Sequence, residues 1–114
     1  MGQLEIYSRT GEIPQKVRDV LVKAMQMKSA IVDSQRQIEE RDRQTQTITA
    51  EQNRIRENMR TVDQQSAYYK RLMSKLNDQE SQIEKLQKER DDLNAKVEQQ
   101  RKELEDYLNN TTVG

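Results

Sequence analysis

The sequence contains no cysteine, histidine, tryptophan or phenylalanine, and its 114 residues include one proline and three glycines. Without cysteine and histidine, thiol chemistry, the common nucleophile–base pairs and the usual zinc sites are excluded. The scarcity of proline and glycine is unlike the composition of a disordered chain. The lack of cysteine means that no disulfide is needed, but it does not identify a compartment. The sequence therefore leaves the localisation unknown.

Apolar residues are also scarce, at 32%, while charged residues reach 35%; globular chains typically have about 45–50% and 25%. So little apolar material cannot fill a layered globular interior, but it can fill a narrow seam between helices. No apolar run approaches the roughly 20 residues that span a bilayer. The composition therefore favours a coiled coil.

An excess of charge of one sign is lacking as well. Basic and acidic residues number 20 each, and neither half of the chain is polarised. A nucleic-acid-binding domain carries a basic face, and a protein on an anionic membrane carries a cationic amphipathic helix. We therefore expect no nucleic acid and no membrane as a partner.

A seven-residue apolar repeat begins at Val17 and continues without a slip. Ten of its fourteen a and d positions are apolar, and these positions are Val17, Val20, Ala24, Met27, Ile31, Ser34, Ile38, Arg41, Thr45, Ile48, Gln52, Ile55, Met59 and Val62. Pro14 suits the first helical position, where its missing N–H has no intrahelical partner. The repeat predicts a helix over residues 14–60 in a left-handed coiled coil.

A second repeat follows and predicts a helix over residues 67–109. Nine of its twelve a and d positions are apolar, and these positions are Tyr69, Leu72, Leu76, Gln79, Ile83, Leu86, Arg90, Leu93, Val97, Gln100, Leu104 and Tyr107. Residues 61–66 are rich in side chains that favour turns, and we expect Ser66 or Asp63 to cap the second helix. Two helices of nearly equal length joined by a short turn fold back antiparallel.

The predicted fold class is therefore all-α, an antiparallel two-helix coiled-coil hairpin over residues 14–110 that can dimerise into a four-helix bundle. Residues 111–114 are expected to form a C-terminal tail. Residues 1–13 differ, because Leu4-Glu5-Ile6-Tyr7 alternates apolar and polar residues as a half-buried strand does. They fit an extended tail and the end of an upstream β domain equally well.

The pairing of the two helices has two candidate registers. Facing residues of an antiparallel pair have a constant sum of residue numbers, and a sum of 124 places Ile38 opposite Leu86. A sum of 131 places Gln52 opposite Gln79, but it also places Arg41 opposite Arg90. Like charges that face each other near a seam are costly, so we expect the register with a sum of 124.

Several features exceed what a two-stranded seam needs. Apolar residues outside the seam form a candidate docking surface; they are Ile13, Leu21, Met25, Val32 and Leu108. Clustered exposed apolar residues mark contact sites, although lysine stems and the tail can also cover them. Tyr68, beside the turn, is a candidate tip contact, or it caps the end of the core. Polar seam positions either fix the register or reach out to solvent.

No constellation of residues indicates catalysis. Adjacent carboxylates such as Glu39-Glu40 and Asp91-Asp92 are expected to be hydrated, whereas acid–base work needs a carboxyl in a dry pocket. A glycine-rich phosphate loop needs a strand–loop–helix context, which is lacking. We therefore expect no enzyme activity, no catalytic, cofactor-binding or metal-binding residues, and no cofactor.

Three runs of sequence carry a family resemblance: residues 16–21 (KVRDVL), 51–58 (EQNRIREN) and 66–76 (SAYYKRLMSKL), the last followed by Gln79-Glu80. They resemble the C-terminal helical region of large uncharacterised bacterial proteins that carry a β-rich domain of unknown function. The resemblance covers most of the chain from Leu4 to Leu108. It implies that Leu4–Tyr7 belong to a preceding β domain, and it transfers no activity.

The expected function is that of a non-catalytic structural or protein–protein interaction module, such as a spacer, docking or oligomerisation hairpin of a larger bacterial protein. Its expected partner is a protein, either a second copy or the parent domain, with a homodimer favoured. One alternative is a prefoldin-like chaperone that holds clients, although residues 61–66 leave no room for the strands such chains carry between their helices. The other is a nucleic-acid-associated coiled coil, which predicts salt-sensitive association.

Overall fold

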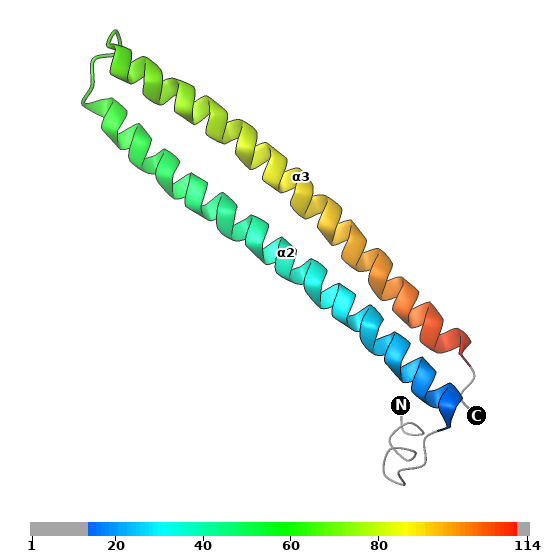
Figure 1. Ribbon diagram of the computed structural model, residues 1–114. Coiled ribbons are helices and arrows are strands. Elements are labelled where there is room, and N and C mark those ends of the chain that lie inside the picture. The colour runs from blue at the N-terminus through cyan, green and yellow to red at the C-terminus, as the bar shows by residue number, and fades with distance from the viewer. Residues whose placement is uncertain (1–13, 112–114) are drawn as a thin grey trace. The chain divides into compact units, whose positions relative to one another are not determined.

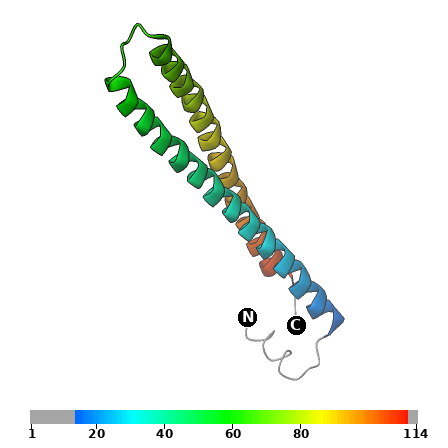
Figure 2. The same cartoon turned by 60° about the vertical axis from the view of Figure 1, so that its left-hand side comes forward.

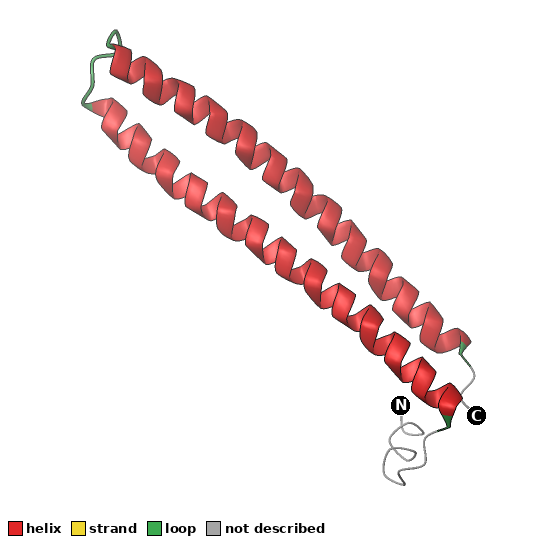
Figure 3. Ribbon diagram, viewed as in Figure 1, coloured by secondary structure: helices red, strands yellow, loops and turns green. Residues whose placement is uncertain are grey.

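The computed structural model describes residues 14–111, which form two long helices. Helix α2 (Gln15–Arg60) has 46 residues and helix α3 (Ala67–Asn110) has 44 residues. A short turn joins them, and they pack against each other (Figure 1). No strand occurs in this part of the chain (Figure 3). The chain is thus an all-α helical hairpin, as the heptad repeats predict. Leu4–Tyr7 and Ile13 lie outside the described residues.

Local sequence explains where α2 begins and ends. The carbonyl of Pro14 accepts the first helical bond from the backbone N–H of Arg18 at 3.0 Å. No proline or glycine follows Pro14 before Gly114. At the other end, the backbone N–H groups of Thr61 and Val62 donate to carbonyls three residues back, at 3.4 Å each. Such bonds tighten a final turn and satisfy carbonyls that lack an α-helical partner.

The turn that joins α2 to α3 can be followed in Figure 2. Side-chain hydrogen bonds hold this turn together. The Asp63 carboxylate accepts a bond from the backbone N–H of Gln65 at 2.9 Å, as in an Asx turn. The Ser66 hydroxyl accepts a bond from the backbone N–H of Tyr69 at 3.1 Å. This bond satisfies a donor in the first turn of α3. Of the two expected N-caps, Ser66 is therefore the cap.

Contacts divide the hairpin into two units. Among the described residues, the terminal unit contains those up to Ser34 and from Lys96 onward, and the turn unit contains Gln35–Ala95. In both units every a and d position of the two repeats is buried or half-buried. The turn unit holds a cluster of buried side chains, Ile55, Leu72 and Leu76, with Met59 packed against it. The heptad seam is therefore the core of each unit.

The expected register, with a sum of 124, is wrong. Ile55 and Leu76, whose numbers sum to 131, belong to one buried cluster. Arg41 Nε lies 3.0 Å from a carboxylate oxygen of Glu89, a pair that sums to 130. In the terminal unit, the Lys23 ammonium lies 4.9 Å from the centre of the Tyr107 ring, and this pair also sums to 130.

Two further ion pairs between the helices have residue-number sums on either side of 131. Pairs in the turn unit sum to 126 for Lys75 with Glu51 and to 136 for Arg56 with Glu80. The residue-number sum of every one of these pairs exceeds 124, and the sums centre on 131. Each unit by itself therefore supports the register with a sum of 131.

The arginines explain why this register is tolerated. Arg41 and Arg90 occupy facing seam positions, which predicts repulsion. Arg41 instead pairs with Glu89, and Arg90 Nη1 lies 3.5 Å from a carboxylate oxygen of Asp42. Each guanidinium thus binds the acid that neighbours the opposite arginine. Two exchanged ion pairs replace a contact between like charges, and they form only when the two arginines lie opposite each other.

Candidate functional site

The carboxylate of Glu51 is paired with a cation of the opposite helix. No group of three or more His, Cys, Asp or Glu side chains that could hold a metal ion occurs in residues 14–111. Lys75 Nζ lies 2.7 Å from Glu51 Oε1, and this bond lowers the pKa of Glu51. A lowered pKa keeps the carboxylate charged, whereas a general acid needs a raised pKa. Neither α2 nor α3 contains an apolar stretch that could span a bilayer.

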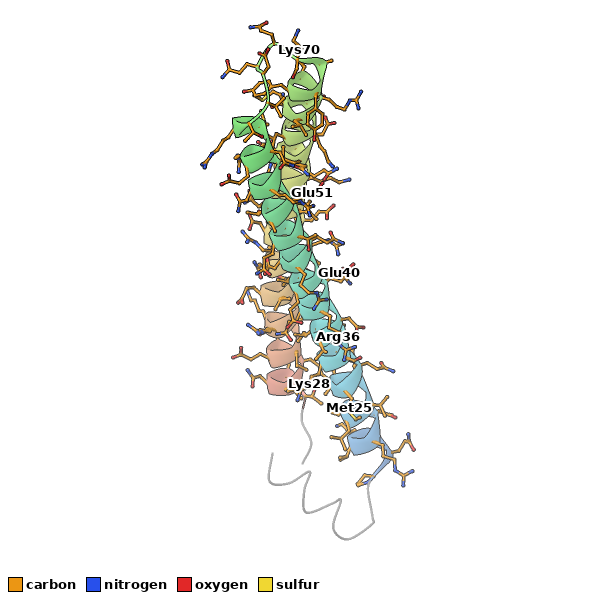
Figure 4. The ribbon with its side chains drawn as sticks, turned by 90° about the vertical axis from the view of Figure 1, so that its left-hand side faces the viewer. Met25, Lys28, Arg36, Glu40, Glu51 and Lys70 are labelled. Carbon is orange, nitrogen blue, oxygen red and sulfur yellow. The ribbon has the colours of Figure 1, made fainter. Side chains whose placement is uncertain are left out.

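The candidate docking surface of the terminal unit is divided by the structure into more and less accessible residues. Met25 is 69% exposed, whereas Leu21, Val32 and Leu108 are half-buried. Ile13 lies outside the described residues. Met25 projects from the first part of α2, where Figure 4 labels it. Among the predicted docking residues that the structure describes, Met25 is the one that is freely accessible.

Val22 was missed by the sequence reasoning, and it is 53% exposed. It lies three residues before Met25, so the two side chains share one face of α2. Their heptad positions are f and b, opposite the seam, and this position is the signal that could have revealed them. We call Val22 and Met25 the terminal apolar pair. Leu21 is at an e position beside the seam, which explains its partial burial.

The tip is the second candidate region. Tyr68 is 49% exposed, as expected for a residue outside the seam, whereas Tyr69 is half-buried within it. Met73 is 40% exposed and was not predicted. A groove beside the turn is lined by residues of both helices and of the turn; they are Arg56, Met59, Arg60, Val62, Gln64, Tyr69, Met73 and Leu76. We call it the tip groove.

A further groove lies in the turn unit between residues 40–48 of α2 and residues 82–89 of α3. The ion pair of Arg41 with Glu89 stands in its lining. The same lining contains Glu40, Arg43 and Lys85, so this groove carries charges of both signs. The tip groove differs, because its lining contains two arginines and no acidic residue.

The polar seam positions fall into two groups. In the turn unit, Gln52 is 2% exposed and donates from Nε2 to Glu80 at 3.0 Å across the seam. Gln79 is 5% exposed, and its Oε1 has no hydrogen-bond partner among the described residues. In the terminal unit, the Ser34 hydroxyl donates to the carbonyl of Ala30 in its own helix at 3.1 Å. The predicted role in fixing register thus has a structural basis at Gln52 but not at Ser34.

No protein-family model, curated protein or solved structure matches this chain.

Proposed function

We propose that this chain is a non-catalytic protein–protein interaction hairpin that self-associates as a dimer. The observation that carries the proposal is the terminal apolar pair, Val22 and Met25, which is exposed on the face of α2 opposite the seam. The two-helix core does not use these side chains. Exposed apolar residues that adjoin one another are typical of contact surfaces.

A second copy of the chain is the occupant that suits this surface best. The pair is small, and a twofold contact doubles it because the same residues face each other from both copies. Helix α2 also presents half-buried Leu21 and Val32 close to the pair, which can extend the contact when two helices pack together. Packing of two hairpins in this way gives the four-helix bundle expected from the sequence.

The proposal is tested by measuring the mass of the protein in solution. We expect sedimentation equilibrium to give twice the chain mass for the wild type, and the mass of one chain for the double variant Val22→Glu with Met25→Glu. Circular dichroism should show unchanged helicity, since both side chains point away from the seam.

A matched control places the same two charges elsewhere on α2. Ala50 and Asn53 are exposed and occupy the same f and b heptad positions in the turn unit. Ala50→Glu with Asn53→Glu should leave the dimer intact. A single-chain mass for the wild type over the accessible concentration range contradicts the proposal. Dissociation of the control to the same extent does so as well, because added charge alone would then explain the effect.

A further inference from the structure

Charge is segregated within the turn unit, although the whole chain is neutral. Residues 53–76 contain six cations, Arg54, Arg56, Arg60, Lys70, Arg71 and Lys75, and two acids, Glu57 and Asp63, for a net charge of +4. The rest of the unit, residues 35–52 and 77–95, contains six cations and ten acids, for a net charge of −4. Residues 53–76, which we call the tip, therefore form a basic surface, although the net charge of the whole chain is zero.

Half of these cations are not engaged within the hairpin. Arg54, Lys70 and Arg71 have no ion-pair partner among residues 14–111. Figure 4 shows Lys70 at the turn end of α3. Arg56 and Arg60 have partners, but their side chains stay 52% and 74% exposed. Exposed pairs of this kind contribute little, so both guanidinium groups can exchange partners at small cost.

The tip groove places apolar surface next to these cations. Its lining includes Met59, which packs on the buried cluster of the turn unit, together with Val62 and Tyr69. Met73 lies at the same groove with 40% of its surface exposed. Methionine side chains adapt to irregular apolar partners. The groove can therefore receive an apolar side chain with basic groups at its edge.

We propose that the tip groove binds an acidic segment of a partner protein that carries an apolar anchor. The anchor enters between Met59, Val62 and Met73, and carboxylates beside it pair with Arg56 and Arg60. The other tip cations attract the acidic segment before contact. This inference names the partner chemistry for a second surface of the interaction hairpin, and it rests on the proposed interaction function.

A second copy of the chain does not offer such a segment. The large apolar side chains exposed among residues 14–111 are Val22, Met25, Tyr68 and Met73. None of them lies in the acidic part of the turn unit. Val22 and Met25 lie in the stretch 14–34, which contains four cations and two acids. Acidic charge and an exposed apolar anchor are thus not combined on the described surface of this chain.

A bilayer also fits the observations less well than a peptide does. A membrane surface meets residues that protrude, whereas the apolar lining here is a groove bounded by two helices and their turn. Grooves between helices are the usual receptors of an extended or helical segment that inserts side chains. The anchor supplies the affinity, and the charges mainly raise the association rate and its sensitivity to salt.

The experiment uses the full chain and a fluorescent helical peptide with leucine anchors at every third or fourth position and glutamates between them, so that the leucines share one face. Its matched probe has lysine in place of every glutamate. We expect anisotropy to show salt-sensitive binding of the glutamate peptide only. Arg56→Glu with Arg60→Glu should weaken that binding by on the order of tenfold or more. Met73→Glu, which removes the apolar rim, should weaken it to a similar degree.

The matched control reverses two charges outside the tip. Arg36 and Lys88 are exposed and form no ion pair among the described residues. Arg36→Glu with Lys88→Glu changes the net charge equally and should leave binding within about twofold. Equal weakening in this control overturns the inference, as does equal binding of the lysine peptide.

Two further probes separate other sources of negative charge. Vesicles rich in phosphatidylserine and a single-stranded RNA are tested in the same buffer. Binding of either probe without binding of the glutamate peptide overturns the inference in favour of a lipid or nucleic-acid partner. Val22→Glu with Met25→Glu should leave peptide binding unchanged. A wild-type protein that is monomeric but binds the peptide therefore contradicts the dimer alone, and a dimer that does not bind it contradicts the tip inference alone.

Discussion

The turn unit and the terminal unit share one heptad pattern, but their polar residues act differently. In the turn unit, Arg41 and Arg90 reach from the seam to Glu89 and Asp42 on the opposite helix. These bonds form in one register only. Arg41 and Arg90 therefore specify which residues of the two helices face each other, whereas in the same unit the Thr45 hydroxyl donates within α2 and Gln79 Oε1 has no partner among residues 14–111.

In the terminal unit, polar seam residues make no such bond among the described residues. Ser34 satisfies its hydroxyl within α2, on the carbonyl of Ala30. Gln100 is half-buried, and its Oε1 has no hydrogen-bond partner within residues 14–111. A polar contact between the helices here is that of the Lys23 ammonium with the Tyr107 ring. Buried polar groups in this unit thus lower stability without selecting a partner across the seam.

A polar residue at a seam position therefore specifies structure only when its partner lies on the other helix. A polar group that is buried without such a partner costs free energy and selects nothing. Replacing a polar seam residue by an apolar one should therefore have different effects on stability in the two units.

The largest effect is expected in the buried cluster of the turn unit. Leu76 is 8% exposed and packs with Ile55 and Leu72. Leu76→Ala should lower the free energy of unfolding by about 2–5 kcal/mol, because it removes buried methyl groups and leaves a cavity. Urea denaturation followed by circular dichroism measures the loss.

Met73 provides the control for this prediction, since it lies on the same helix but is 40% exposed. Met73→Ala should change the free energy of unfolding by no more than about 0.5 kcal/mol. Equal losses for the two variants would show that the cluster is not the core of the turn unit.

Most of the fold follows from the sequence because helix geometry ties a strict seven-residue repeat to one buried face. The repeats therefore predicted both helices, and residue preferences at helix ends predicted the Ser66 cap. The register was predicted wrongly because Arg41 and Arg90 were compared with each other alone. The neighbouring acids, Glu89 and Asp42, determine the electrostatic energy of this register, because each forms an ion pair with the arginine of the opposite helix.

The candidate sites could be predicted from the sequence less completely than the fold. Met25 and Tyr68 were expected outside the seam and are exposed. Val22 and Met73 were missed because an isolated apolar residue on an outer face is common in helices. The tip groove depends on side chains from both helices and the turn. Residues that far apart in the sequence come together only when the register is known.

The second prediction tests the register directly with paired cysteines. Thr45 and Leu86 face each other when residue numbers sum to 131, whereas Ile38 and Leu86 do so at 124. The registers differ by a shift of about 10 Å along the helices. Thr45→Cys with Leu86→Cys should oxidise to an intrachain disulfide, and the closed loop should stabilise the hairpin by about 2–4 kcal/mol.

Ile38→Cys with Leu86→Cys is the matched control, because it retains one of the two cysteines. Under dilute oxidising conditions it should stay reduced or link separate chains, as non-reducing electrophoresis and mass spectrometry will show. Rapid intrachain closure of this control, with slow closure of the first pair, would restore the register with a sum of 124.

The third prediction exchanges a seam glutamine for leucine in each of the two units. Gln100→Leu should raise the free energy of unfolding by about 1 kcal/mol, because it removes an unpaired buried carbonyl and adds apolar surface to the seam. Gln52→Leu should gain less or lose stability, because it breaks the bond to Glu80 across the seam. The difference between the two variants, measured by urea denaturation, is the informative quantity. If Gln52→Leu stabilises more than Gln100→Leu, the contrast between the units fails.

The smallest effect concerns the exposed edge of the turn unit and appears as a dependence on pH. The short bond from Lys75 holds the pKa of Glu51 below its ordinary value of 4.5. A carboxyl with a lowered pKa in the folded state contributes stability above its unfolded pKa, and this contribution is lost as the pH falls through the lowered value. Lys75→Met should therefore weaken the hairpin slightly at neutral pH and by less in acid.

Carbon-detected NMR titration of the Glu51 carboxyl separates this bond from the general basic charge of the tip. In Lys75→Met the pKa of Glu51 should rise toward the ordinary value. In Lys70→Met, which removes a tip cation without an ion-pair partner, it should stay low. Salt should raise the pKa of Glu51 in the wild type, because an exposed pair is screened. A Glu51 titration that is the same with and without Lys75 would show that this bond does not persist in solution, and it would remove one bridge from the set that distinguishes the turn unit.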